Sequence, residues 1–319
     1  MELIDLKLDR LTIVGKMKTV NKEIRVGNNK FTNYDSNVLE ILKSTRDVAI
    51  KESREYASPV YNWRFKIGGH TLVQVRTTQG DGNDFRVEFN PSKVNEEEMK
   101  LIKSLLENVK AKIYTRIDLA LDIKADLSKG WKITDKKSRK IGEYRSGASG
   151  QLETHYRGTN HSNSQIRIYN KAKEQNRSKG ALMRGQEEEL KEQIRLDTMY
   201  SDWWRIEETI RGEKSEWWED HNWYEGIEIV KETAMPIFPE GTKPNMKANV
   251  LTCMQYPEII DEYSKNTRTA IRKVMKELAY GDGQAFSPSE VLEKEKALTF
   301  AEVKGQLKSY IEIGEFLKI

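Results

Sequence analysis

The sequence predicts an α+β fold, in which an antiparallel β-sheet with helices packed on one face precedes a mainly helical C-terminal region. Two observations lead to this prediction. Segments of alternating apolar and polar residues, typical of half-buried strands, recur from the N-terminus to about residue 210. After about residue 230, prolines and a glycine interrupt the chain, and the patterns beyond them are helical. We therefore expect two domains, 1–230 and 231–319.

Strand-like segments follow one another through the first of these domains. Residues 3–14 alternate as a half-buried strand does. Two alternating runs flank Gly68-Gly69, a dipeptide that permits a tight hairpin turn. Residues 140–157 are typical of a second hairpin, which turns through 146–150. Further strands are expected at 85–90, 115–123, 164–171 and 203–210.

Helices are expected where capping residues precede apolar residues at helical spacing. Asn95 and Glu98 form a start that resembles a capping box. Ser287-Pro288 is a favourable first turn, because proline suits the first helical position. The charged segment 172–197 is expected to be a solvated helix. The expected C-terminal helices span 246–256, 260–278, 288–296 and 300–317.

Four of the predicted strands place an arginine and a second polar residue two positions apart, so that both project from one face. Two interpretations are open. The strands could form a polar floor on which carboxylates bind a divalent cation and arginines bind phosphates, or the charged residues could form ordinary cross-strand ion pairs. The four pairs are Arg86 and Glu88, Arg116 and Asp118, Arg167 and Tyr169, and Arg205 and Glu207.

Composition excludes several kinds of site. The single cysteine, Cys253, excludes an internal disulfide framework, and the four histidines lack the close spacing of a zinc motif. No apolar run approaches the roughly 20 residues of a membrane span, and the N-terminus is acidic where a signal peptide would be basic. We therefore expect a cytoplasmic protein without a membrane partner. The net charge of +4 permits nucleic-acid binding without requiring it.

Five segments carry a resemblance to a known family, and they are LTIVG (11–15), FRVEFNPSKVNEEEM (85–99), YTRIDLALDI (114–123), IRIYNKAKE (166–174) and WWRIEETI (203–210). They resemble the replication initiators of small rolling-circle plasmids of Gram-positive bacteria, called Rep_trans. The order and spacing of the segments are similar, and the resemblance covers most of the chain. A divergent or inserted segment, Arg177–Gly185, touches none of these motifs.

The resemblance implies a metal-dependent, site-specific DNA nickase and strand transferase that initiates rolling-circle replication. The family's nucleophile is the tyrosine of its IYNK motif, which matches Tyr169. Attack at the plasmid's double-strand origin would give a 5′-phosphotyrosine and a free 3′-hydroxyl primer, and the reverse attack would rejoin DNA at termination, as in a topoisomerase. Arg167 and Lys171 would assist, because a phenol with a pKa of about 10 needs cationic neighbours or a base to be a nucleophile.

The acidic strands of the family match Glu88, Asp118 and Glu207 here. We expect these three to bind Mg²⁺ or Mn²⁺, because both ions prefer oxygen ligands. Asp122 and Glu174 also match family positions, and either could be a ligand or an outer-shell partner.

DNA contacts are expected on the polar floor and on the basic helix 260–278, within a segment, 245–278, that we assign to the duplex beside the nick. The alternative for that helix is a solvated surface packed on the nickase domain. Bases of the unpaired strand could stack on Tyr61 and Trp63 or on Trp203 and Trp204, although each of these residues could instead belong to the core. The expected DNA-contacting residues are Arg86, Arg116, Arg205, Lys265, Arg268, Arg272 and Lys273.

The resemblance also implies three partners. These are the double-strand origin, with its hairpin single strand and adjacent duplex, a second copy in a homodimer, and a host superfamily 1 helicase of the PcrA/UvrD type. Two other functions remain open. A non-catalytic DNA-binding initiator or repressor would need neither Tyr169 nor the acids, and a tyrosine recombinase would need an Arg/His/Arg cluster that the few histidines do not supply.

Overall fold

The computed structural model describes residues 2–17, 19–26, 29–36, 38, 41–42, 48–54, 61–68, 70–76, 84–137, 139–147, 150–175 and 202–314. The strands are β1 (Glu2–Met17), β2 (Thr19–Val26), β3 (Asn29–Ser36), β4 (Val48–Arg54), β5 (Tyr61–Ile67), β6 (Thr71–Arg76), β7 (Phe85–Phe89), β8 (Val109–Lys124), β9 (Trp131–Asp135), β10 (Ile141–Arg145), β11 (Leu152–Arg157), β12 (Ser164–Asn170), β13 (Trp203–Arg211), β14 (Ile227–Lys231) and β15 (Ala285–Phe286). The helices are α2 (Glu96–Glu107), α5 (Glu213–Glu216), η1 (Trp218–Asp220), α6 (Pro244–Gln255), η2 (Pro257–Glu262), α7 (Lys265–Glu277), α8 (Pro288–Lys294) and α9 (Ala297–Glu312).

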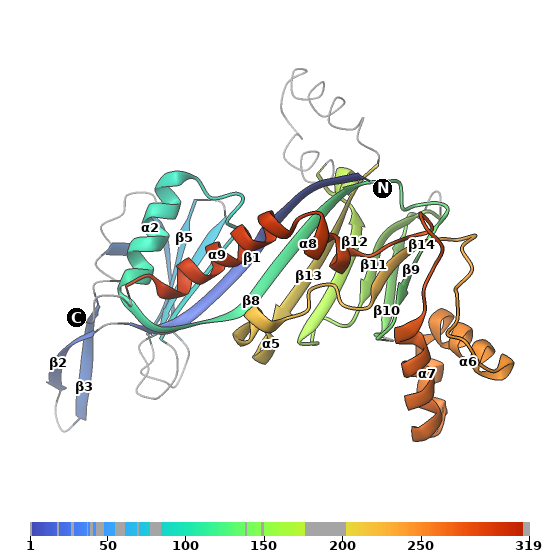
Figure 1. The fold of residues 1–319 in the computed structure, drawn as a ribbon. Helices are drawn as coiled ribbons and strands as arrows, with labels where there is room; N and C mark the ends of the chain where they lie inside the picture. The colour runs from blue at the N-terminus through green and yellow to red at the C-terminus, as the bar shows by residue number, and fades with distance from the viewer. Residues whose placement is uncertain are drawn as a thin grey trace, which may run out of the picture. The chain divides into compact units, whose positions relative to one another are not determined.

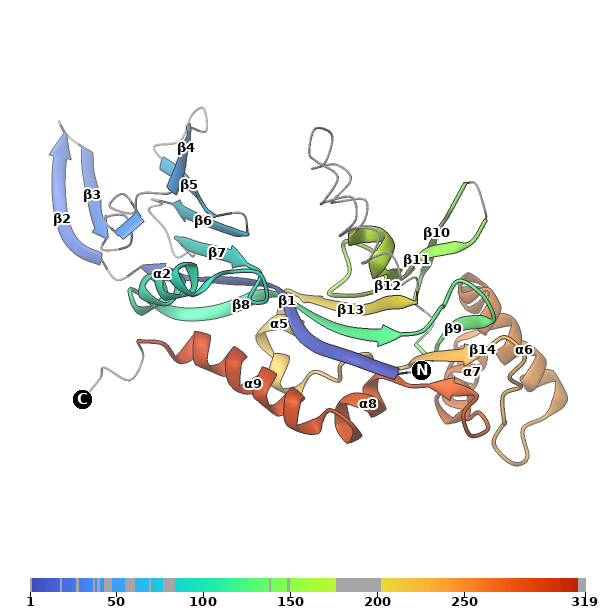
Figure 2. The same cartoon turned by 90° about the horizontal axis from the view of Figure 1, so that it is seen from above.

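The predicted α+β class is confirmed, with a large antiparallel sheet and helices that are concentrated after β14 (Figures 1 and 2). Ten strands are hydrogen-bonded in the order β10-β11-β12-β13-β8-β1-β7-β6-β5-β4. Three strands, in the order β15-β14-β9, form a second sheet, and β2 and β3 form a separate hairpin. The predicted hairpins, β5–β6 and β10–β11, both form.

The chain divides into two compact units. Unit 1 consists of Met1–Leu6, Ala120–Thr209 and His221–Phe300, and unit 2 consists of Lys7–Leu119, Ile210–Asp220 and Ala301–Ile319. Each unit therefore contains segments that are far apart in the sequence. The predicted domain boundary between residues 230 and 231 stays a prediction.

In unit 2, α2 and α9 pack on the apolar side of β7. The ring of Tyr310 on α9 meets Phe89 edge-on, with 5.4 Å between centroids, and its hydroxyl lies 3.6 Å from the sulfur of Met99 on α2. Tyr114 of β8 donates a hydrogen bond to the carbonyl oxygen of Leu307 at 2.8 Å. The predicted cap of α2 is confirmed, because the Oδ1 of Asn95 accepts a bond from the backbone of Glu98.

In unit 1, the second sheet lies against the face of β11 and β12 that carries Arg157, Ile166 and Ile168. Ile166 and Ile168 are fully buried on that side, and the buried guanidinium of Arg157 donates to the carbonyl oxygen of Ile133 on β9. Helices α6 and α7, with η2 between them, have their own apolar cluster, to which Val250, Ile271 and Met275 contribute.

Two helix predictions need comment. The predicted helix 260–278 is wrong in extent, because Ser264 interrupts it and caps α7, its Oγ accepting a bond from the backbone of Thr267 at 3.3 Å. The predicted helix 172–197 is helical up to residue 175, and its remainder lies outside the described residues. Among the helices that the structure describes, none is long and apolar enough to cross a membrane.

Candidate active site

Strand β12 brings Tyr169 to the polar face of the sheet. Ile166 and Ile168 take the buried apolar face, so that Arg167 and Tyr169 project from the other, as the alternation predicts. Asn170 then ends the strand, and its Oδ1 accepts a hydrogen bond from the backbone of Lys173 at 2.9 Å. This cap begins a helical turn over 171–175.

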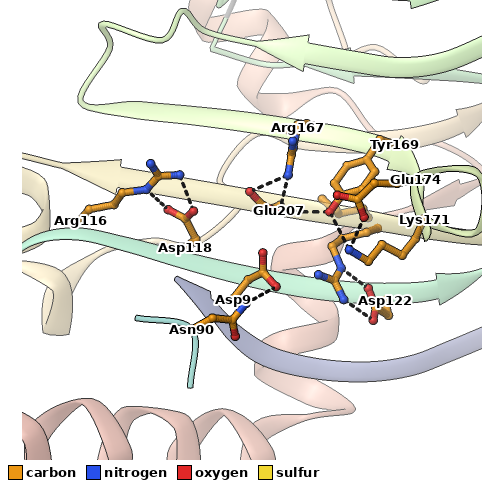
Figure 3. Close-up of polar contacts among 12 residues, drawn as sticks. Asp9, Asn90, Arg116, Asp118, Asp122, Arg167, Tyr169, Lys171, Glu174 and Glu207 are labelled. Carbon is orange, nitrogen blue, oxygen red and sulfur yellow. Dashed lines mark hydrogen bonds and ion pairs between the residues drawn. The ribbon is translucent and has the colours of Figure 1, made fainter. Parts of the chain in front are cut away.

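Three side chains surround the phenol of Tyr169, which is only 4% exposed (Figure 3). Its hydroxyl donates to Oε2 of Glu207 on β13 at 3.3 Å, and it lies 3.5 Å from the Nζ of Lys171. The guanidinium carbon of Arg167 lies 4.2 Å from the centre of the ring. Arg167 also donates to both oxygens of Glu207, at 3.2 and 2.9 Å. The carboxylate of Glu207 therefore accepts hydrogen bonds from both the Tyr169 hydroxyl and the Arg167 guanidinium.

The environment favours the neutral phenol. Burial raises the pKa of Tyr169 well above its usual range, and the charge of Glu207 raises it further. Arg167 and Arg205 act in the opposite direction, but they do not outweigh these effects. Burial would lower the pKa of Arg167, yet Glu207 and the phenol raise it above its ordinary value, so this side chain stays cationic.

Two further ion pairs between charged side chains lie in unit 1, the unit that contains Tyr169. Arg205 forms two bonds with Asp122 of β8, from Nε at 2.5 Å and from Nη2 at 2.8 Å, and both side chains are buried. Lys171 is ion-paired with Glu174 (Figure 3). Asp122 and Glu174 therefore each hold a cation near Tyr169, and a DNA phosphate could bind Arg205 only by competing with Asp122.

In unit 2, arginines likewise bind the predicted acidic residues. Glu88 pairs with Arg86 on its own strand at 3.1 Å and with Arg10 of β1. Arg116 donates two bonds to Asp118, at 2.8 and 2.6 Å (Figure 3). Two of these pairs lie within one strand, Arg86 with Glu88 and Arg116 with Asp118, whereas the pair of Arg10 with Glu88 joins two strands. Ion pairing does not decide whether the same carboxylates bind a metal.

The metal-binding role of Glu88, Asp118 and Glu207 stays a prediction. Within the ranges that the structure describes, no group of three or more histidine, cysteine, aspartate or glutamate residues is placed to hold a metal ion.

Two groups near the predicted residues were not expected from the sequence. Arg10 reaches Glu88 because Thr12 pairs with Glu88, and Arg10, two positions before Thr12 on β1, projects from the same face. Glu208 lies on the face of β13 opposite Glu207, where its carboxylate accepts a bond from Ser164 at 2.8 Å. The sequence shows no sign of that buried contact.

The predicted DNA-contacting helix presents its cations outward. Ile271 and Met275 of α7 are buried, whereas Lys265, Arg272 and Lys273 are exposed. Arg268 is partly buried and lies 3.4 Å from Asp261. A DNA contact by this helix stays a prediction.

The aromatic residues predicted to stack on bases differ in burial. Trp204 is fully buried, in agreement with the alternative that it belongs to the core, and Trp203 is partly buried. Tyr61 and Trp63 lie in β5, but their side chains are outside the described part of the chain.

Comparison with known proteins supports the resemblance described above. No protein-family model matches the chain. A replication initiation protein of Staphylococcus aureus is 25% identical over 295 residues, which are 92% of this chain and 83% of that protein. Another from the same species is 27% identical over 226 residues, 70% of this chain and 65% of that protein.

Among solved structures, a rolling circle replication initiator protein from Geobacillus stearothermophilus is 18% identical and has a TM-score of 0.35, covering 66% of this chain and 77% of that one. The predicted resemblance is confirmed by the sequence relatives: over nearly all of its length, this chain is similar to replication initiation proteins of Staphylococcus aureus.

Proposed function

We propose that this protein initiates rolling-circle replication of a plasmid by nicking and rejoining DNA through Tyr169. Its similarity to replication initiation proteins over 92% of the chain supports the general function. The observation that carries the chemistry is the contact of one tyrosine hydroxyl with a carboxylate and an ammonium group, Glu207 and Lys171. This combination offers an acceptor for the phenolic proton and a cation beside the oxygen that attacks.

The proposed reaction exchanges one phosphodiester for another. The phenolic oxygen of Tyr169 bonds to the scissile phosphorus while the bond from phosphorus to the 3′-oxygen breaks. The phenol loses its proton and the departing 3′-oxygen gains one, so the products are a 5′-phosphotyrosine and a free 3′-hydroxyl. Since the new ester retains the energy of the old one, a 3′-hydroxyl can reverse the reaction without ATP.

Within this reaction, Arg167 and Lys171 are assigned to the charge of the phosphate. Arg167 lies against the ring of Tyr169 and remains cationic. The Nζ of Lys171 is buried beside the hydroxyl. Cations held in advance at a water-poor site stabilise the negative charge that develops in the transition state.

We further propose that Mg²⁺ or Mn²⁺ binds Glu88, Asp118 and Glu207, because carboxylate oxygens suit these hard cations. When bound, the ion would neutralise non-bridging phosphate oxygens. Each of the three carboxylates is described in an ion pair with arginine, so metal binding would compete with these pairs. The expected outcome is nicking that needs Mg²⁺ or Mn²⁺ and is abolished by EDTA.

The DNA partner is proposed to be the double-strand origin. Arg86 and Arg116 are assigned to the phosphates of the single strand, and the exposed face of α7 is assigned to the neighbouring duplex. A homodimer and a host superfamily 1 helicase are proposed from the resemblance alone.

The decisive experiment uses a supercoiled plasmid that carries the cognate origin. We expect the wild-type protein to form a nicked product with protein attached to the 5′ end, and Tyr169→Phe to form none while melting normally. Tyr310→Phe is a matched control, because it also removes one hydroxyl from a buried tyrosine. Unchanged nicking by Tyr169→Phe would refute the assignment, and origin binding without any covalent product would favour a non-catalytic initiator.

A further inference from the structure

Two more tyrosines lie on the face of the sheet that carries Tyr169. The antiparallel register pairs Tyr144 of β10 with Thr154 of β11, and Thr154 with Tyr169 of β12. Directly paired residues project from the same face, so these three side chains form one cross-strand row. Two strand spacings of about 4.8 Å place the backbones of Tyr144 and Tyr169 roughly 10 Å apart.

The neighbouring row contains the second tyrosine. Gly142 of β10 pairs with Tyr156 of β11, and Tyr156 pairs with Arg167 of β12. A Cβ at Gly142 would lie 3.5 Å from the Cβ of Tyr156 and 3.7 Å from its Cδ2, so the Tyr156 ring leans over the glycine. Tyr156 is therefore placed between the outer strand and Arg167, a cation of the candidate site.

The burial of this hairpin differs between its two faces. His155 and Arg157, on the face opposite Tyr169, are almost completely buried. Tyr144, by contrast, is 54% exposed. A single exposed tyrosine is common at a protein surface. Tyr144, however, lies in the cross-strand row of Tyr169, the proposed nucleophile, and beside the row that contains Arg167.

We propose that Tyr144 and Tyr156 form a stacking platform for bases of the unpaired DNA strand held at Tyr169, an inference that rests on the proposed function. Aromatic rings stack on bases of any sequence, because every base has a π-face. Arg167 supplies positive charge beside the platform for the phosphate backbone. At a rise of about 3.4 Å per nucleotide, the roughly 10 Å between Tyr144 and Tyr169 places the stacked base within about three nucleotides of the scissile phosphate.

The first test measures binding of a single-stranded origin oligonucleotide in EDTA by fluorescence anisotropy. Tyr144→Ala is expected to weaken binding by between about 5-fold and 150-fold, the range for loss of one base–aromatic stack. Tyr144→Phe keeps the ring and is expected to bind within about 2-fold of wild type. Ile141→Ala is the matched control, since Ile141 is exposed on the same strand but pairs with Arg157 and so lies on the other face.

The second test locates the stacked base with oligonucleotides that carry one abasic site at successive positions. In the wild type, one abasic site within about three nucleotides of the nick should weaken binding. In Tyr144→Ala the same abasic site should cause no further loss, because the stacking partner is already absent. Additive effects at every position would overturn the platform, as would wild-type affinity in Tyr144→Ala.

These outcomes separate the platform from the proposed function. If wild type nicks the origin and binds the oligonucleotide, but Tyr144→Ala binds equally well, the platform is wrong and the proposed function stands. If wild type neither binds nor nicks, both are wrong. The intact melting transition of Tyr144→Phe and Tyr144→Ala would show that any loss of binding is not a loss of folding.

Discussion

At the scale of single residues, Tyr169 shows how burial and charge oppose each other at one oxygen. The pattern of the strand suggested a phenol activated by two flanking cations. Both cations lie beside the ring, yet burial and Glu207 make the net shift in the phenol's pKa upward. The described arrangement therefore favours the neutral hydroxyl, so removal of its proton adds to the activation free energy of the attack.

The upward shift in the pKa of Tyr169 predicts how nicking depends on pH. Below its pKa, the ionised fraction of a phenol rises tenfold for each pH unit, and burial keeps this pKa above the assay range. The single-turnover nicking rate should therefore climb through pH 7 to 9, by up to about tenfold per unit, without a plateau. A rate that is level over this range would contradict this prediction, because it would show that the phenolic proton passes to a base of the protein, such as Glu207, and not to the solvent.

At the scale of elements, β13 carries adjacent carboxylates with different environments. Glu207 projects toward Tyr169 and Arg167. Glu208 projects to the other face, where it accepts bonds from Ser164 of β12 and from the backbone of Tyr224, a residue just before β14. The second carboxylate thus links two strands of the large sheet to the segment that leads into the small one.

Removing this link should destabilise the fold. Glu208→Ala leaves the donors of Ser164 and Tyr224 buried without this acceptor, and we expect a loss of about 3–5 kcal/mol in the free energy of unfolding. Urea denaturation would measure it. Glu225→Ala is the control, because its ion pair with Lys137 is half-exposed and should contribute less than about 1 kcal/mol. Equal losses in the two variants would contradict the assignment.

Glu208 also predicts a pH dependence of stability. Burial would raise the pKa of Glu208, but His221, the Tyr224 backbone and Ser164 together lower it. A carboxylate with a lowered folded-state pKa contributes stability above its unfolded pKa of about 4.3, and this stability is lost as the pH falls through the folded value. The melting temperature of wild type should consequently fall more steeply below about pH 4 than that of Glu208→Gln.

At the scale of the whole molecule, charge is nearly balanced but unevenly distributed. A net charge of +4 on 319 residues does not indicate a nucleic-acid surface. The exposed cations of α7, by contrast, share the outer side of one helix whose inner side packs on α6 and η2. This local concentration of charge is the physical basis for assigning α7 to duplex DNA.

The assignment of α7 predicts the salt dependence of origin binding. Arg272→Gln and Lys273→Gln should each weaken duplex binding and reduce the slope of log affinity against log salt by about one, because each lost phosphate contact releases one counterion fewer. Lys294→Gln is the control, since Lys294 is an exposed lysine on α8. If Lys294→Gln changes the slope of log affinity against log salt as much as the α7 variants do, the net charge of the protein accounts for binding, and the assignment of α7 to duplex DNA is wrong.

Local patterns were sufficient to predict many elements of this fold. The alternation of β7 and β12 and the cap of α2 depend on neighbours within a few residues, so they could be recognised along the chain. The resemblance to replication initiators also needed no structure, because it depends on the order and spacing of short segments.

Long-range pairing determined the rest. The strands β9 and β14 are five residues each and are separated by about 90 residues, so neither shows its partner in sequence. The pairing of Arg205 with Asp122, and the placement of Tyr144 in the row of Tyr169, likewise follow from which strands become neighbours. Alternation assigns a side chain to a face, but register chooses its neighbours and burial sets the pKa of its charged groups.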